Sequence, residues 1–534
     1  MNRLCALPLV WGFALLAGPP LEIAGRVIDA QTGAPVARAR VSITPSGSQS
    51  AEIVILAGDD GAFHLTGVPE GNYQLSCERV GYLRGFQNVQ SQPVPAAADA
   101  KPVSLAIRLT PQAVIEGAVV DESGGAVPFA NIQIYRRVAI DGRRHAQFVS
   151  EAQTDDKGSF RIFDLAAGAY CIGVTVSPAG MRLRKLAYPP VFYPNSPAMA
   201  NAQFVDLRPG QEQQIRIRLP EPVPAHEIRG QVVPPLEGAG VQLRPADSVA
   251  VGGPSSFAPQ YSDQKTHTFK FTGVTPGVYA IDVTALLDGQ QRRATTIVTV
   301  ADRDIAGIRL ELPGQTTLTG TVRVEGQDAP PRSAAMVALH SSSGQFGASV
   351  QADGSFEFRN LQADTYRVVV SPGGAAYLRS AWQGGRDVLQ YGLTISAETP
   401  PSPLEITLGS PGGTVEGAVA LRDSVQTDFM VVALLRRAGN AMVLEKQATV
   451  SGSLSAGTAS SINDRPPVYG GMRFTLQGVA PGDYLLFAWP AEAQVEYADP
   501  EFARQHDDLR KPLTVTEGAK VTVNIDRALF LNQP

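Results

Sequence analysis

The sequence has few of the residues, and none of the motifs, through which enzymes usually bind metals or activate nucleophiles. Its 6 histidines are scattered over 534 residues, and none lies in an H-E-x-x-H or similar ligand spacing. A G-x-S-x-G nucleophile elbow, a glycine-rich phosphate loop and a cysteine in a catalytic context are also missing. We therefore predict no catalytic residues, no metal ligands and no cofactor, and an enzyme is the least favoured class of function.

The chain also lacks an excess of charge of either sign. Its 45 basic and 50 acidic residues leave a formal net charge of -5, and the basic residues form no cluster. Proteins that bind nucleic acids, or dock on membranes by electrostatic attraction, carry basic patches. The composition therefore predicts no nucleic-acid partner and no electrostatic docking on a membrane.

Long apolar runs are missing except at the amino terminus. There Arg3 precedes an apolar run from Leu4 to Ala17, about the length of a signal-peptide core and too short to span a bilayer. We expect residues 1–18 to be a signal peptide and the protein to be exported, to the cell surface, the periplasm or the medium. After removal of this peptide we expect no membrane insertion.

Cysteine is nearly absent, with 3 residues in the chain. Without the leader, Cys77 and Cys171 remain, in different copies of the repeat described next. A disulfide between them would require Cα atoms within about 7 Å of each other, which two separate domains rarely offer. Both are therefore expected to be unpaired and to behave as small hydrophobic residues.

What the chain has in abundance is one pattern that occurs five times. Each copy has a phenylalanine, a Val or Leu five residues later, and a tyrosine ten residues after the phenylalanine. In all but the fourth copy, which has Asp364, a glycine stands two residues before the tyrosine. The pairs are Phe63 and Tyr73, Phe160 and Tyr170, Phe269 and Tyr279, Phe356 and Tyr366, and Phe474 and Tyr484. Self-similarity at such a long period predicts a tandem array of domains.

The residues around each pair alternate as half-buried strands do. In the second copy Phe160 and Ile162 share one face of a strand, and Tyr170 and Ile172 share one face of the next. The L/V-x-x-G-x-Y connection between them resembles the tyrosine corner of β-sandwiches, whose tyrosine hydroxyl bonds to backbone a few residues upstream. We therefore expect the repeated rings to lie in a core rather than at a ligand site.

A glycine followed by a short β-branched strand opens each unit, at positions 25, 117, 230, 320 and 417. The steps between these glycines are 92, 113, 90 and 97 residues, and a unit of this size can bury its own core. We predict an all-β chain, a tandem array of five seven-stranded Ig-like or transthyretin-like β-sandwiches. The predicted units are residues 22–110, 112–219, 226–312, 315–408 and 413–530. Short Pro-rich links favour semi-rigid spacing, and an extended array would be a rod on the order of 150 Å long.

The first two units carry a more specific signature. After Gly25 and its strand come a turn from Asp29 to Gly33, then Pro35-Val36, and then a strand from Ala39 to Ile43. The second unit repeats this order, and both units continue into the Phe and Tyr pattern. The order resembles the carboxypeptidase regulatory-like domain, a transthyretin-like sandwich of secreted bacterial proteins that is related to starch-binding-like sandwiches. This resemblance implies a non-catalytic, carbohydrate-binding-like fold. Units three to five keep the second half of the pattern better than the first.

Function is more often located in the loops that differ between units than in the repeat itself. Two irregular segments, 187–198 and 377–391, are rich in aromatic residues, whose flat rings stack on sugars or peptides when they are exposed. Two other irregular segments, 252–265 and 451–471, also differ between units and are candidates as well. The candidate ligand-binding residues are Tyr188, Phe192, Tyr193, Tyr377, Trp382 and Tyr391. The alternative is that these rings cover loop or inter-domain cores, and the same alternatives apply to Phe487 and Trp489.

Two further features have structural interpretations. Acidic turns at Asp59-Asp60, Asp155-Asp156 and Asp353 are compatible with calcium, but a carboxylate beside a glycine is more simply a turn. Residues 496–509 are expected to hold one short helix, with Asp499 as the N-cap and Pro500 at the first helical position.

Together these features favour a secreted, non-catalytic, multi-domain binding or adhesion protein. A polysaccharide is the first ligand class to test, and an extracellular or envelope protein is the next. The alternative is a structural spacer or scaffold that presents a partner at the cell surface.

Overall fold

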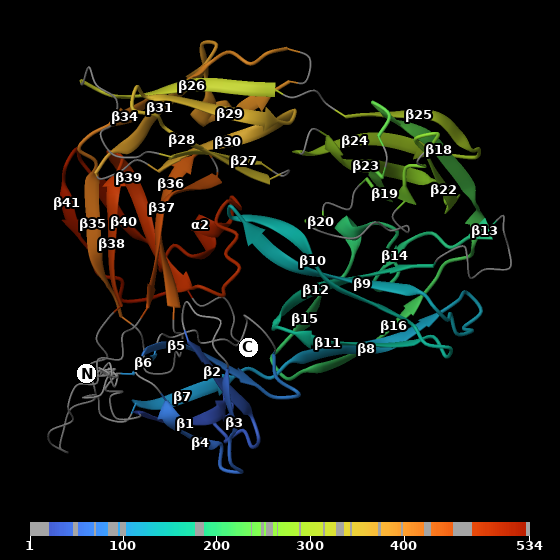
Figure 1. The fold of residues 1–534 in the computed structure, drawn as a ribbon, viewed down its shortest axis with the longest axis horizontal. Helices are drawn as coiled ribbons and strands as arrows, with labels where there is room; N and C mark the ends of the chain where they lie inside the picture. The colour runs from blue at the N-terminus through green and yellow to red at the C-terminus, as the bar shows by residue number, and fades with distance from the viewer. Residues whose placement is uncertain are drawn as a thin grey trace, which may run out of the picture.

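The structure is a computed structural model in which nearly all regular elements are β-strands (Figure 1). It describes residues 21–45, 52–68, 71–83, 94–96, 103–176, 186–236, 238–246, 250–251, 260–263, 265–287, 290–312, 316–326, 336–341, 344–371, 375–396, 399–420, 429–439, 441–451 and 472–529. Successive groups of strands in these residues form pairs of sheets around hydrophobic cores, which we call sandwiches 1 to 5. The all-β class with tandem β-sandwiches is thereby confirmed, whereas the predicted boundaries between units stay a prediction.

Sandwiches 1 and 2 occupy the first half of the chain. In sandwich 1 one sheet has the order β4-β1-β7 and the other β3-β2-β5-β6. Their strands are β1 (Leu21–Asp29), β2 (Arg40–Pro45), β3 (Ile53–Leu56), β4 (Ala62–Val68), β5 (Gly71–Glu78), β6 (Val94–Ala96) and β7 (Val103–Leu109). In sandwich 2 the orders are β11-β8-β16 and β14-β12-β9-β10-β20, with β15 beside β12. Their strands are β8 (Ala113–Val120), β9 (Asn131–Ile140), β10 (Arg143–Gln153), β11 (Ser159–Leu165), β12 (Gly168–Thr175), β14 (Val191–Phe192), β15 (Val205–Leu207), β16 (Glu212–Arg218) and β20 (Ala250–Val251).

Sandwich 3 has the sheets β22-β18-β25 and β21-β19-β23-β24. Its strands are β18 (His226–Val233), β19 (Gly240–Pro245), β21 (Gln260–Tyr261), β22 (Thr268–Val274), β23 (Gly277–Leu287), β24 (Gln290–Val300) and β25 (Ile305–Glu311). Sandwiches 2 and 3 are joined by β20, which follows β19 in the chain but pairs with β10, and by the short pair β13 (Leu186–Ala187) and β17 (Val223–Pro224).

Sandwich 4 has the sheets β29-β26-β34-β31-β32 and β28-β27-β30-β33, and sandwich 5 has β38-β35-β41 and β37-β36-β39-β40. The strands of sandwich 4 are β26 (Thr316–Val324), β27 (Met336–Ser341), β28 (Gly344–Ser349), β29 (Ser355–Leu361), β30 (Asp364–Ser371), β31 (Tyr377–Gln383), β32 (Arg386–Asp387), β33 (Leu393–Ile395) and β34 (Leu404–Gly409). Those of sandwich 5 are β35 (Gly413–Val419), β36 (Phe429–Ala438), β37 (Ala441–Ser451), β38 (Met472–Val479), β39 (Gly482–Pro490), β40 (Lys511–Val515) and β41 (Lys520–Thr522).

The opening glycine and the repeated phenylalanine of each unit are direct partners on neighbouring strands. The pairs in register are Gly25 and Phe63, Gly117 and Phe160, Gly230 and Phe269, Gly320 and Phe356, and Gly417 and Phe474. A Cβ added at Gly25 or Gly230 would lie 2.6 Å from Cζ of the paired ring. It would also lie 2.4 Å from the carbonyl oxygen of Leu105 or 2.5 Å from that of Ile308, on the parallel neighbour strand. The glycine is therefore required because both the ring, in an interaction known as aromatic rescue, and the neighbouring backbone leave no room for a Cβ.

The predicted tyrosine corner is also present. The hydroxyl of Tyr170 donates to the carbonyl of Ala166 at 2.6 Å, and the tyrosines of sandwiches 3, 4 and 5 donate in the same way to the residue four positions upstream. In sandwich 1 the corresponding position, 69, lies outside the described residues. Tyr170 and Tyr366 are among the largest fully buried side chains, so the repeat specifies the core, as expected.

Both described cysteines are unpaired and buried, as predicted. Cys77 belongs to the core of sandwich 1. Cys171 lies on the opposite side of its sheet, in a second apolar layer with Tyr135 and Phe192. Burial raises the pKa of each thiol to about 12, which keeps the thiols protonated at neutral pH.

Helices are few and short in the described residues. The helix α2 (Phe502–Gln505) begins later than the predicted start at Pro500, because Asp499 Oδ1 accepts the N–H of Glu501 (2.8 Å) in a turn that precedes the helix. A second helix, α1 (Val388–Tyr391), and a 3-10 turn, η3 (Met199–Asn201), were not predicted. In the described part of the chain no helix is long and apolar enough to cross a membrane. The predicted signal peptide lies outside the described residues.

Sandwiches 2 to 5 lie around a circle in Figure 1, with sandwich 1 below them in this view. The segment that holds α2 in sandwich 5 is next to β10 of sandwich 2, and hydrogen bonds connect the two. The array is therefore folded back on itself and is not an extended rod.

Candidate ligand-binding surface

In sandwich 2 the predicted aromatic cluster covers a sheet. Phe192 is only 4% exposed and pairs through β14 with β12, where its ring lies over Gly173. Tyr188 and Tyr193 are half-buried against the main core. Burial, reinforced by the neighbouring Glu122 carboxylate that accepts the Tyr188 hydroxyl (3.2 Å), raises the pKa of Tyr188 to about 12. For Phe192 the expectation of an exposed ring is wrong, because the ring packs in an apolar layer with Tyr135, Cys171 and Met199.

Tyr377 of sandwich 4 also has a structural position. It is 5% exposed, and its ring lies against Gly409 on the neighbouring strand β34, where a Cβ would collide with it. This is the same ring-over-glycine contact that the repeat uses. The expectation that Tyr377 stands in an exposed cluster is therefore also wrong.

Trp382 is the predicted ring that stands exposed on a sheet, with 43% of its surface accessible. It alternates on β31 with the fully buried Ala381, so that the indole faces outward. The strand ends in a tight turn at Gly384 and Gly385, whose φ values of 54° and 79° lie in the left-handed region that glycine adopts without strain. The chain then returns as β32, with Asp387 opposite Trp382.

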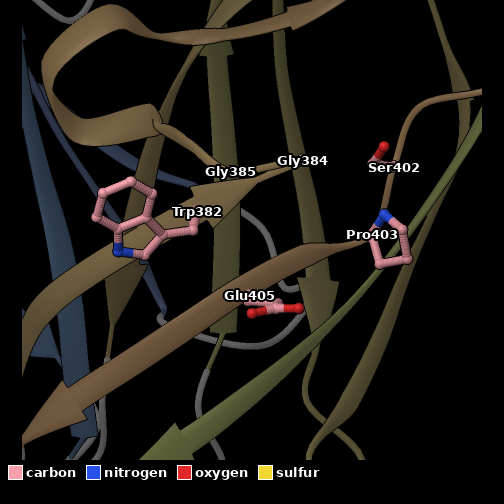
Figure 2. A pocket seen from close by; sticks show the side chains of 6 residues that line it. All are labelled: Trp382, Gly384, Gly385, Ser402, Pro403 and Glu405. Atoms are coloured by element: carbon pink, nitrogen blue, oxygen red, sulfur yellow. The ribbon is translucent and has the colours of Figure 1, made fainter.

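Beside the indole is an open pocket of about 380 Å³. It is lined by Trp382, Gly384, Gly385, Ser402, Pro403 and Glu405 (Figure 2). Glu405 is the direct partner of Trp382 on β34, and side chains of directly opposed residues project from the same face of a sheet. A hydrogen bond from Gln383 Nε2 to the carbonyl of Ser402 (3.0 Å) holds the two ends of the pocket together.

The polar groups of this pocket are available to a ligand. Within the described residues, the carboxylate of Glu405 makes no hydrogen bond or ion pair, and Glu405, Ser402 and Pro403 are all exposed. The pocket therefore combines one flat aromatic face with a carboxylate acceptor and a hydroxyl. Small-ligand sites commonly pair an apolar surface with a few polar groups in this way.

Tyr391 is exposed as well, at 55%, but it does not line the pocket. It is the last residue of α1, whose N-cap Asp387 accepts the N–H groups of Leu389 (2.9 Å) and Gln390 (3.3 Å) through Oδ1. The guanidinium of Arg386 lies 5.1 Å from the centre of the Tyr391 ring, in a cation–π contact. This contact holds the Tyr391 ring at the end of the segment 377–391.

The acidic turns are explained by local hydrogen bonds. Asp155 Oδ1 accepts the N–H groups of Lys157 (2.9 Å) and Ser159 (2.8 Å), and Asp353 Oδ1 accepts that of Ser355 (2.9 Å). Each carboxylate thus closes a tight turn that connects a strand of one sheet to a strand of the other. Among the described residues no three His, Cys, Asp or Glu side chains come together in a way that could hold a metal ion.

Sequence reasoning missed the pocket residues Ser402, Pro403 and Glu405. They belong to the strand that closes unit four, and its pairing with β31 is not visible from the local pattern. The alternation of Glu405 between the buried Leu404 and Ile406 indicates that Glu405 faces outward, but it does not indicate which residue lies opposite. The predicted segments 252–265 and 451–471 lie largely outside the described residues.

Comparisons with known proteins give limited similarity. No curated protein matches the sequence. Among solved structures, the Bacillus anthracis TIE protein is 14% identical with a TM-score of 0.17, over 55% of this chain and 51% of that chain, about half its length. A streptococcal ancillary pilin is 12% identical with a TM-score of 0.18, over 55% and 99% of the two chains. GBS52, the minor pilin of Streptococcus agalactiae, is 11% identical with a TM-score of 0.23, over 38% and 98%. Scores this low carry no argument about function.

One family model matches part of the chain. The match covers residues 22–109, the range over which the strands of sandwich 1 were described above. The resemblance inferred from the sequence is therefore confirmed for this part: residues 22–109 are similar to the carboxypeptidase regulatory-like domain.

Proposed function

We propose that the protein is an exported, non-catalytic binding or adhesion protein, and that the pocket beside Trp382 binds a carbohydrate. The observation that carries the proposal is the exposed indole at the mouth of an open pocket, next to the carboxylate of Glu405, which has no partner among the described residues. A sugar ring has an apolar face that stacks on an indole and hydroxyl groups that donate to a carboxylate.

The size of the pocket supports one or two sugar units rather than a long chain segment. Its volume of about 380 Å³ lies near the lower end of the range of about 300–1,000 Å³ found for small-ligand sites. With one aromatic face and a few polar groups, the site supports weak binding. A polymer that offers many copies of the same sugar would raise the apparent affinity through multivalency.

The spacer function is the less favoured alternative. A spacer that holds a partner away from a surface needs an extended shape, whereas sandwiches 2 to 5 are folded back on themselves. We also propose that the protein is exported to the cell surface, the periplasm or the medium. An extracellular or envelope protein is the second class of partner that we propose.

The test is retention of the purified protein by a panel of insoluble and gel-embedded polysaccharides. We expect the wild type to be retained by at least one of them, Trp382→Ala to lose retention, and Glu405→Gln to weaken it. The matched control is Tyr391→Ala, which removes an exposed ring of the same sandwich outside the pocket and should leave retention unchanged. No retention on any polysaccharide, or full retention of Trp382→Ala, would refute the carbohydrate site.

A further inference from the structure

The tip of the β9–β10 hairpin in sandwich 2 contacts a loop of sandwich 5 that is far away in the sequence. The residues involved are 139–144 on the hairpin and 494–498 on the loop, and one of their hydrogen bonds joins positions 355 residues apart. Sandwiches 3 and 4 lie between them along the chain. This contact therefore closes sandwiches 2 to 5 into a ring (Figure 1).

Its strongest polar interaction is a two-pronged ion pair. Arg144 donates from Nε to Glu496 Oε1 at 2.9 Å and from Nη2 to Oε2 at 2.7 Å. The Glu496 side chain is only 22% exposed, so that it is partly shielded from water and salt. Fork-to-fork pairing of guanidinium and carboxylate fixes the relative orientation of the two groups, in addition to attracting them.

Backbone groups take part in the same contact. The N–H of Ala139 donates to Gln494 Oε1 at 2.9 Å, and the N–H of Ala498 donates to the carbonyl of Gly142 at 3.0 Å. These bonds require the hairpin and the loop to meet in one register.

An aromatic ring fits the turn of the hairpin. Asp141 and Gly142 have φ values of 50° and 71°, the left-handed pair of a tight hairpin turn. Tyr497, 7% exposed, lies against Gly142, where an added Cβ would come within 2.5 Å of Cε2. On the side of sandwich 5, Tyr497 stacks with Trp489 at 6.3 Å between ring centres. Asp141 also faces Arg367 of sandwich 4 at 3.6 Å, so that three sandwiches meet here.

We propose that residues 139–144 and 494–498 form a latch that holds the array in a closed ring, and that parting the latch gives an open form of the protein. The contact is specific, because hydrogen-bond donors on one side meet acceptors on the other and the Tyr497 side chain packs against Gly142. It also involves few residues, and the Arg144 side chain is 57% exposed to solvent. Relative motion is the expected behaviour of domains whose contact is not large and hydrophobic. The latch thus sets the shape of the whole array through a few side chains.

Variants of the full chain in which the charges of Arg144 and Glu496 are reversed or exchanged test the latch. The measurement is small-angle X-ray scattering. We expect Arg144→Glu and Glu496→Arg each to increase the radius of gyration and the maximum dimension, because like charges replace the ion pair. The double variant Arg144→Glu/Glu496→Arg restores the pair in reverse and should return the scattering profile to that of the wild type. The matched control is Arg161→Glu, which makes the same charge change in an ion pair within sandwich 2 (Arg161 to Glu212, 2.9 Å) and should leave the ring closed.

A second variant tests the packing of the Tyr497 side chain against Gly142 without a change of charge. Gly142→Ala should open the array through collision with Tyr497, whereas Gly124→Ala, at a left-handed glycine with no atom within 4 Å of the added Cβ, should not. The latch is overturned if the single charge reversals leave the wild-type scattering profile, if the double variant fails to restore it, or if Gly142→Ala stays closed.

Discussion

Sandwiches 2, 4 and 5 carry extra chain at the same place in the repeat, directly after the strand of the corner tyrosine. In sandwich 2 this segment folds over the outer face of the sheet and builds a second apolar layer with Tyr135, Cys171 and Phe192. In sandwich 5 residues 493–509 do the same over Phe487 and Trp489. In sandwich 4 the segment crosses to the other sheet and extends it as β31 and β32, which leaves Trp382 exposed.

The difference shows that an aromatic residue in an irregular segment has no fixed role. In the sequence Phe192 and Trp382 are equally good candidates for ligand binding. In the structure Phe192 packs on a sheet, whereas Trp382 stands beside a pocket. Beneath both lies the same frame of ring over glycine and tyrosine corner. Substitutions in the covering layers and in that frame should therefore have different effects on stability.

The largest expected effect comes from removal of a covering ring. Phe192→Ala should lower the free energy of unfolding of sandwich 2 by about 3–5 kcal/mol, the usual cost of emptying a buried aromatic site. Chemical denaturation measures it. Cys171 lies in the same layer and should become open to alkylation of the native protein, while Cys77, in the core of sandwich 1, stays protected. Unchanged stability together with an unreactive Cys171 would show that the layer is not a packed core.

The frame beneath should respond to a single methyl group. Gly230→Ala places Cβ 2.6 Å from Cζ of Phe269 and 2.5 Å from the carbonyl oxygen of Ile308, and should lower the free energy of unfolding by about 1–3 kcal/mol, the range for overpacking. Gly240→Ala is the control in the same sandwich, because its added Cβ meets nothing closer than 3.7 Å. Thermal melts of the two variants compare them directly, and equal melting temperatures would refute the ring-over-glycine explanation.

The tyrosine corner should contribute less. Tyr366→Phe removes one hydrogen bond to the carbonyl of Gln362 (2.9 Å) and should cost about 0.5–1.5 kcal/mol of unfolding free energy. Tyr391→Phe, in the same sandwich but 55% exposed, should leave the melt unchanged. If both variants melt alike, the corner bond does not stabilise the sandwich.

Much of the fold follows from the sequence because the frame is periodic. The local spacing of Phe160, Tyr170 and their repeats predicts strands, corners and core positions. In the structure these residues lie in the core and the tyrosines form the corners. The opening glycines were also visible, but their pairing with the phenylalanines was not, since it joins strands far apart in the chain.

The candidate site was only half predictable for the same reason. Trp382 could be chosen as a large ring in an irregular segment, but Phe192 and Tyr377 met that description equally well and are buried. Glu405 became a neighbour of Trp382 only through strand pairing, and Arg144 met Glu496 only through the closure of the ring. Contacts across a long stretch of chain leave no local pattern to read.

The smallest expected effect on stability is that of Trp382→Ala, and it decides the comparison between the two kinds of ring. Because 43% of the residue is exposed and no second layer formed by the described residues covers it, we expect a change within about 0.5 kcal/mol in the free energy of unfolding of sandwich 4, as for an ordinary surface substitution. Denaturation followed by circular dichroism measures it, with Phe192→Ala as the buried counterpart. A cost of several kcal/mol would place Trp382 among the covering rings. A negligible cost together with lost polysaccharide retention would mean that this ring serves a ligand.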